Sequence, residues 1–319
     1  MRVDSDRVIE LLREKDNILI LTHRSPDGDT LGCGTALCRV LIDMGKKARV
    51  ENSEEIPSKY DYLFEDLPVL DFEPAFIIAV DVADTKLLGD KLSVYADKID
   101  LCIDHHGSNP GYAKELYLMP DDGAAALTLY RILKKMGADI TPHIANSLYT
   151  GLSTDTGCFK YSNANSEAYR AAADLIDLGA ENAAINVMMF ETKPIEYFKL
   201  LTEVLANMRM FCDGQCAVFK ITQEMFDRTG ATPDCCDAIS ALSRQIEGVK
   251  IGITMKEREG GKFKFSLRTH EPLDASELCR AFGGGGHKRA AGCDPDRNEE
   301  EVLGKLVALI EERLKSEQV

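Results

Sequence analysis

The sequence lacks the features that mark membrane proteins, secreted proteins and zinc sites. No apolar run reaches the roughly 18 residues of a membrane-spanning helix, and residues 1–14 are charged throughout, without a signal-peptide pattern. The 10 cysteines are scattered and none are spaced as Cys-x-x-Cys, so neither a zinc site nor a thioredoxin-like motif is indicated. We therefore expect a cytoplasmic protein without membrane partners, whose thiols are reduced and mostly buried.

An excess of basic residues is also missing. The chain has 38 Lys and Arg against 53 Asp and Glu, which gives a net charge of −15. Because nonspecific affinity for duplex nucleic acid comes from neutralising phosphates, we expect no binding to duplex DNA. A small phosphorylated substrate bound at one basic patch is compatible with this balance, especially if bound cations supply further positive charge.

Length and hydrophobic pattern predict two domains of the α/β class. A chain of 319 residues is too long for one ordinary core. Short apolar runs at 17–22, 75–80 and 99–103 alternate with helical segments, which is the pattern of a mainly parallel, doubly wound sheet covered on both faces. We expect this N-terminal domain over residues 1–190, followed by a helical connector over residues 191–210.

A smaller C-terminal α/β domain with a mixed sheet is expected over residues 211–319. Strands at 249–256 and 262–269 predict a hairpin. The second of these strands alternates strictly between apolar and polar residues, so its polar side chains share one face. These polar residues are Lys262, Lys264, Ser266 and Arg268.

A cluster of metal-competent side chains lies between the first apolar run and a helix expected at 30–44. It contains His23, Asp27 and Asp29, and Gly28 allows a tight bend that points both carboxylates into one pocket. Their repulsion would raise one pKa, and a cation would remove the conflict. Imidazole and carboxylate ligands suit Mn²⁺ or Mg²⁺ better than zinc. The alternative is that Asp27 or Asp29 only caps the helix.

Further polar residues follow the other apolar runs. Asp81 ends the second run, and Asp104, His105 and His106 end the third. Because the carboxyl ends of parallel strands meet at one edge of an open sheet, we expect these residues beside the first cluster. Asp155 is expected in a polar turn at 153–157, where an Asx-turn is the alternative role.

Together these residues resemble the four ordered motifs of the DHH phosphoesterase superfamily. The segment 283–292, which reads GGGGHKRAAG, resembles the glycine-rich motif of the associated DHHA1 domain. The motifs extend over nearly the whole chain and are similar to those of the RecJ-like nanoRNase and pAp-phosphatase branch, where pAp is 3′-phosphoadenosine 5′-phosphate. The first motif departs from the commoner pattern at Arg24 and Cys33, and neither departure removes an expected ligand.

The resemblance implies a centre of two Mn²⁺ ions, with Mg²⁺ as a substitute. Two such ions could activate a water molecule and stabilise charge on a phosphoryl group. His106 would bind phosphate or donate a proton, and Asp104 would orient a histidine. By similarity, the expected ligands are His23, Asp27 and Asp81 for one ion, and Asp29, Asp81, His105 and Asp155 for the other.

The glycine run can form an anion-binding nest of backbone amides, with a flexible loop as the alternative. The alternative for the basic strand face is an ordinary solvated surface. By family similarity, Arg268 and His287 would bind the distal phosphate of the substrate. The other residues expected to line this phosphate-binding pocket are Ser266, Gly284, Gly285 and Gly286.

The resemblance therefore implies a Mn²⁺-dependent phosphoesterase. Expected substrates are oligoribonucleotides about two to five residues long, including dinucleotides (pNpN), and pAp, with the spacing of two binding stations acting as a ruler. Alternatives are a linear or cyclic dinucleotide phosphodiesterase, a pyrophosphatase or exopolyphosphatase, and a noncatalytic nucleotide-binding protein. The complete ligand set argues against the last. The acidic surface and terminal helix permit a homodimer without requiring one.

Overall fold

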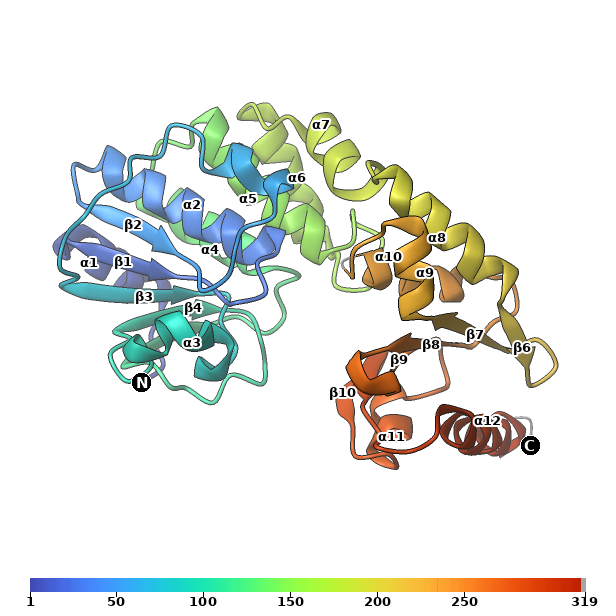
Figure 1. Ribbon diagram of the computed structural model, residues 1–319. Helices are drawn as coiled ribbons and strands as arrows, with labels where there is room; N and C mark the ends of the chain where they lie inside the picture. The colour runs from blue at the N-terminus through green and yellow to red at the C-terminus, as the bar shows by residue number, and fades with distance from the viewer. Residues whose placement is uncertain (234, 317–319) are drawn as a thin grey trace. The chain divides into compact units, whose positions relative to one another are not determined.

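The computed structural model describes residues 1–233 and 235–316, without the side chains of Asp237, Glu259 and His287. The chain divides into two compact units, Met1–Thr192 and Lys193–Val319, and each unit contains its own sheet (Figure 1). Among the helices of the described residues, none has both the length and the apolar character needed to cross a membrane.

The first unit contains a five-stranded sheet in the order β2-β1-β3-β4-β5. All neighbouring strands pair in parallel, which confirms the predicted sheet type. The chain turns to opposite sides of β1 to add β2 and β3, so the strand order reverses here, and ligands collect at such a point. The strands are β1 (Ile18–Leu21), β2 (Ala48–Glu51), β3 (Phe76–Val80), β4 (Leu101–Asp104) and β5 (Glu115–Leu118).

Both faces of this sheet are buried. In β1, Ile18 and Ile20 contribute to one apolar core while Leu19 and Leu21 contribute to another, which explains why the strand has no polar position. Helices α2, α4 and α5 cover the first face, and α3 lies against the second (Figure 1). The helices are α1 (Ser5–Glu14), α2 (Gly28–Asp43), α3 (Gly89–Leu92), α4 (Ala125–Met136), α5 (Pro142–Asp155), α6 (Ser166–Asp177) and α7 (Asn182–Asn186).

The turn predicted at 153–157 begins later, at Thr156, because α5 continues to Asp155. The hydroxyl of Thr154 donates to the carbonyl of Thr150, and that of Thr156 donates to Leu152. These hydroxyls therefore bond within the helix and do not interrupt it. The consequence is that Asp155 is presented by the end of a packed helix.

The second unit contains a six-stranded sheet in the order β10-β11-β9-β8-β7-β6. Only β7 and β8 pair in parallel, so the sheet is mixed as predicted, and β8 and β9 form the predicted antiparallel hairpin. The strands are β6 (Arg209–Phe211), β7 (Cys216–Ile221), β8 (Ile251–Glu257), β9 (Phe263–Thr269), β10 (Gly285–His287) and β11 (Ala290–Cys293).

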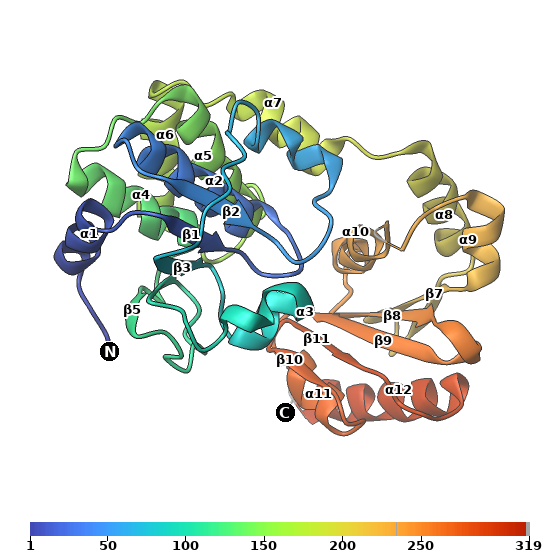
Figure 2. The same ribbon diagram turned by 60° about the vertical axis from the view of Figure 1, so that its left-hand side comes forward.

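Helices also cover both faces of this second sheet (Figure 2). The apolar residues Phe263, Phe265 and Leu267 of β9 are buried against α11 and α12, which confirms the predicted alternation. The helical connector expected over residues 191–210 contains a shorter helix, because β6 begins at Arg209. The helices are α8 (Ile195–Ala206), α9 (Gln223–Thr229), α10 (Cys235–Leu242), α11 (Ala275–Arg280) and α12 (Glu299–Ser316).

Candidate metal centre

The ends of three parallel strands and two helices bring polar side chains to one edge of the first sheet. His23 follows β1, Asp81 follows β3, and His105 follows β4, while Asp29 lies in the first turn of α2 and Asp155 ends α5. Parallel strands all present their carboxyl ends at this edge, so residues far apart in sequence become neighbours there.

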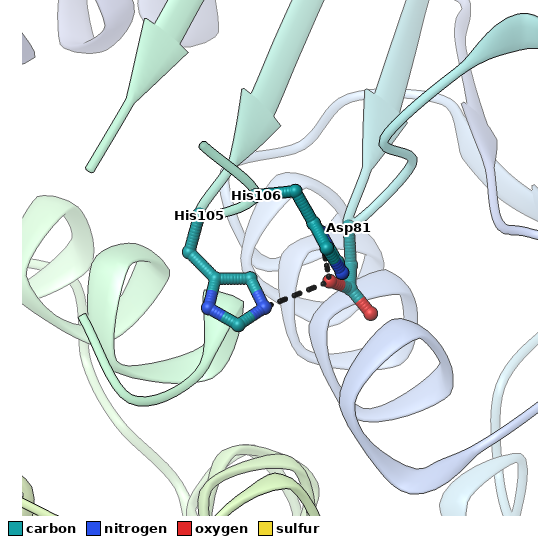
Figure 3. Close-up of side chains that lie close together, drawn as sticks. All are labelled: Asp81, His105 and His106. Atoms are coloured by element: carbon teal, nitrogen blue, oxygen red, sulfur yellow. Dashed lines mark ion pairs between the residues drawn. The ribbon is translucent and has the colours of Figure 1, made fainter. Parts of the chain in front are cut away.

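Asp81 lies at the middle of the cluster. Its side chain is buried, and its Oδ1 lies 3.5 Å from His105 Nε2 and 3.6 Å from His106 Nδ1, as Figure 3 shows. Its Oδ2 lies 3.6 Å from His23 Nε2. Among the described residues Oδ1 has no hydrogen-bond donor. A buried carboxylate oxygen without a donor is costly unless it is paired, and a divalent cation would satisfy it.

Asp27 has two different tasks. Its Oδ1 accepts hydrogen bonds from the backbone N–H groups of Asp29 and Thr30, so it caps α2. Its Oδ2 remains directed at the cluster, 3.5 Å from His23 Nε2. Capping and metal binding are therefore compatible at this residue, because each uses a separate oxygen.

Asp29 caps a different helix. It accepts hydrogen bonds from the backbone N–H groups of Ala125 and Ala126, at the start of α4. Burial, together with the charges of Asp81 and Asp155, raises the pKa of Asp29 well above its usual value. A cation bound beside Asp29 would counter these carboxylate charges.

The glycine between these aspartates permits a close contact between helices. Gly28 lies within α2, and a Cβ at this position would come within 2.3 Å of Thr154 Oγ1 in α5. The backbone of Gly28 is helical and makes no tight bend, so the predicted reason for this glycine is wrong. Its function is to let α5 pack against α2, which places Asp155 beside Asp29.

The structure gathers the six expected ligands into overlapping groups. In each group, one ligand atom per residue lies within 4.8 Å of the others, and Asp81 belongs to two groups. No sulfur is included, so the donor set suits a hard or borderline cation such as Mn²⁺ or Mg²⁺. The groups are His23, Asp27 and Asp81; Asp29, His105 and Asp155; and Asp81, His105 and His106.

The ring orientation of His105 is set by a residue that sequence reasoning missed. His105 Nδ1 lies 3.0 Å from the backbone carbonyl oxygen of Asp122, so Nδ1 carries the donated proton. Nε2 then faces Asp29, Asp81 and Asp155, where a cation could take the place of its proton. The Asp122 side chain bonds with Thr128 and Arg131. Nothing in the pattern around Asp122 distinguishes it from an ordinary turn residue.

His106 is oriented by Asp104, which is fully buried at the end of β4. The Nδ1–H of His106 donates to Asp104 Oδ1 at 2.8 Å, and Asn109 Nδ2 donates to Asp104 Oδ2 at 2.7 Å. The hydrogen bond to Asp104 raises the pKa of His106. This arrangement leaves Nε2 of His106 for a ligand. Asn109 was also missed, because a single Asn after the histidines has no signal of its own.

A small cavity of about 180 Å³ gives access to the cluster. His106 and Asp155 line it together with His23, Asp27 and Asp81. The carboxylates would therefore repel a phosphoryl group that entered this cavity, unless bound cations lay between the phosphoryl group and the carboxylates.

In the second unit, Ser266 and Arg268 lie half-buried on the polar face of β9. The glycine run is partly a strand, because Gly285 and Gly286 pair with Gly292 and Ala291 in β11.

Gly284 allows the start of the glycine run to pack closely against β11, because a Cβ there would lie 2.2 Å from the carbonyl oxygen of Gly292. The glycine run is therefore not a loop throughout, because its last residues pair with β11. The side chain of His287 lies outside the described part of the chain.

Family models match both units. The DHH family, N-terminal domain, matches residues 17–152, and the DHHA1 domain matches residues 213–316. The chain is 30% identical over 308 residues to a bifunctional oligoribonuclease and PAP phosphatase NrnA from Thermus thermophilus, covering 93% of this chain and 91% of that protein. It is 23% identical over 297 residues to the protein of the same name from Bacillus subtilis, covering 92% of each.

Solved structures share the same fold. An exopolyphosphatase-related protein from Bacteroides fragilis matches with a TM-score of 0.88 at 24% identity, over 98% of this chain and 97% of that chain. An exonuclease RecJ bound to manganese matches with a TM-score of 0.53 at 15% identity, over 96% of this chain and 94% of that chain.

Proposed function

The chain belongs to the DHH phosphoesterase family and is an enzyme of the DHH/DHHA1 type, and from this premise we propose that it is a Mn²⁺-dependent hydrolase of short oligoribonucleotides and of pAp. The observation that carries the proposal is the shared position of Asp81 between two groups of metal-competent side chains. Similarity to oligoribonuclease and PAP phosphatase proteins over nearly the full chain supports the substrate class.

The orphaned Oδ1 of Asp81 and the sulfur-free donor set fit a pair of Mn²⁺ or Mg²⁺ ions. When bound, two such ions supply an activated water and neutralise charge on the phosphoryl oxygens. We assign one ion to His23, Asp27 and Asp81, and the other to Asp29, Asp81, His105 and Asp155.

The chain's own groups orient the metal ligands and handle the proton of the leaving group. Asp122 holds His105 in the tautomer whose Nε2 is a ligand. His106, oriented by Asp104, donates a proton from Nε2 to the leaving oxygen or binds the phosphate. The hydrogen bond from His106 Nδ1 to Asp104 keeps a proton on that nitrogen and fixes the direction of Nε2.

In the second unit, we assign substrate binding to Ser266 and Arg268 of β9 and to the glycine motif. Arg268 and His287 bind the phosphate distal to the cleaved bond, and the motif glycines bring backbone amides close to it. The expected residues beside Arg268 and His287 are Ser266, Gly284, Gly285 and Gly286.

The test is product formation from a 5′-phosphorylated diribonucleotide and from pAp, side by side, with Mn²⁺ and with chelator. We expect Mn²⁺-dependent release of mononucleotide and no turnover with chelator. Asp81→Asn should abolish turnover, with Asp84→Asn as control, because Asp84 only caps a short turn outside the cluster. Turnover of pyrophosphate or polyphosphate alone would contradict the assignment, as would tight Mn²⁺ binding without turnover of any substrate.

A further inference from the structure

The second unit contains a cavity of about 640 Å³ that includes Ser266 from the assigned substrate-binding residues and is otherwise unused by the function above. It lies between one face of β8 and β9 and the helices α9 and α10. Three cationic side chains line it, in a chain whose net charge is −15. They are Lys256, Arg258 and Lys264.

Two of these cations are placed against each other. Lys256 and Lys264 are direct partners on neighbouring antiparallel strands, so their side chains point to the same face. Like charges in such a pair, with Cβ atoms about 5 Å apart, repel each other. Among the described residues, neither lysine has a carboxylate within ion-pair distance. An anion bound between the two ammonium groups would remove the repulsion.

The remaining charges leave the cavity positive. Glu257 is the only carboxylate that the described lining includes, and its Oε2 accepts the backbone N–H of Gln223. Arg258 lies 3.6 Å from Asp294, a partly exposed pair that is weakly held. Lys256 Nζ donates to the backbone carbonyl oxygen of Pro233 at 3.4 Å, and an ammonium group has two further donors, so both lysines can still bind an anion.

The floor of the cavity carries hydroxyl groups and an aromatic ring. Thr254 is 2% exposed, lines the cavity, and has no hydrogen-bond partner for Oγ1 among the described residues. Its direct cross-strand partner is Ser266, which also lines the cavity. Phe226 completes the lining, with Lys256 Nζ at 5.8 Å from its ring centroid. Cations, hydroxyls and a ring are the groups that bind phosphate, ribose and base.

We propose that this cavity binds a nucleoside monophosphate unit, with its phosphate between Lys256 and Lys264. Alternate residues of β9 lie about 7 Å apart, so the polar face continues from Lys264 through Ser266 to Arg268. The nucleotide unit can therefore be a further residue of a longer oligoribonucleotide, which rests on the proposed function. The nucleotide unit can also be a free mononucleotide, and this second case does not rest on the proposed function.

The test compares Lys264→Ala with Lys262→Ala in the full-length protein. Lys262 is the matched control, because it pairs with Asp296 at the surface and does not line the cavity. One arm measures kcat/KM for 5′-phosphorylated oligoribonucleotides of increasing length from the dinucleotide. The other arm titrates AMP calorimetrically. Lys256→Ala serves as a second cavity variant if Lys264→Ala folds poorly.

A loss of about tenfold in kcat/KM for the longer substrates in Lys264→Ala, with the dinucleotide unchanged, supports a substrate continuation site. Loss of one AMP-binding event without any length effect supports a free mononucleotide. Cavity variants that match Lys262→Ala in both arms overturn the proposal. If the wild-type protein cleaves no oligoribonucleotide, the proposed function fails. The AMP titration still tests whether the cavity binds a mononucleotide.

Discussion

At the residue scale, two carboxylates two positions apart have separate structural partners. Asp27 caps its own helix, whereas Asp29 accepts the first amides of α4, nearly a hundred residues later in the chain. Each is therefore held by backbone donors before any cation binds. A rigid pair of this kind reduces the ordering that metal binding would otherwise require.

Asn109 is predicted to act through Asp104 on His106. Asn109→Ala removes the donor to Asp104 Oδ2, so Asp104 is held only through Oδ1, by the backbone N–H groups of His105 and His106, and it orients the ring of His106 less firmly. We expect kcat to fall by about 10- to 100-fold, with KM and Mn²⁺ stoichiometry little changed. Steady-state kinetics and a Mn²⁺ titration check this. Loss of bound metal in the variant would show that Asn109 supports the metal ligands instead.

Mn²⁺ binding is predicted to release protons. Burial lowers the pKa of His23, but hydrogen bonds with Asp27 and Asp81 outweigh it and raise the pKa to about 10. The pKa of His105 is likewise about 10, because Asp81 and Asp29 outweigh its burial. Both rings are therefore protonated near neutral pH without metal, and a coordinating imidazole must lose that proton.

Mn²⁺ affinity should consequently rise with pH between about 6 and 9. Calorimetric titration in two buffers of different ionisation enthalpy measures the protons released. Binding heats that are the same in both buffers would contradict the prediction. His143→Ala is a suitable control, because this histidine lies outside the cluster.

At the scale of elements, close packing between backbones decides where functional residues lie. Gly28 lets α5 approach α2 and so delivers Asp155 to the cluster. Gly284 likewise lets its own backbone approach β11 closely, and the residues that follow it in the glycine run form β10. Glycines in functional motifs therefore serve packing as well as ligand approach.

Gly284 and Gly285 are predicted to differ sharply when replaced by alanine. A Cβ at Gly284 would lie 2.2 Å from the Gly292 carbonyl oxygen, whereas a Cβ at Gly285 meets nothing within 4 Å. We expect Gly284→Ala to lower the free energy of unfolding by about 1–3 kcal/mol and Gly285→Ala to leave it nearly unchanged. Denaturant unfolding checks this, and equal stability of both variants would refute it.

At the scale of the whole molecule, the metal centre belongs to the first unit and the assigned substrate-binding residues belong to the second. Binding energy from parts of a substrate remote from the reacting phosphate can be used to orient that phosphate. An enzyme built in this way should lose specificity, and keep its chemistry, when only the second unit is altered.

Arg268→Ala is predicted to raise KM for a diribonucleotide by about tenfold or more and to leave hydrolysis of a simple phosphodiester such as bis(p-nitrophenyl) phosphate nearly intact. Lys262→Ala is the matched control, since it removes a surface cation from the same region. Parallel kinetics on both substrates provide the measurement. Equal losses on both substrates would show that Arg268 supports the fold or the metal centre.

The sequence by itself determined β1, β3 and β4, the hairpin of β8 and β9, and the positions of the metal-competent residues, because these depend on local patterns. Alternation in β9 and the polar residues after β1, β3 and β4 are readable without contacts. Only the tertiary structure decided that α5 extends to Asp155 and that the motif glycine Gly284 packs against β11. It also decided that Asp122 and Asn109 orient the histidines. These facts depend on which backbones meet, and packing between distant segments leaves no periodic signal in the chain.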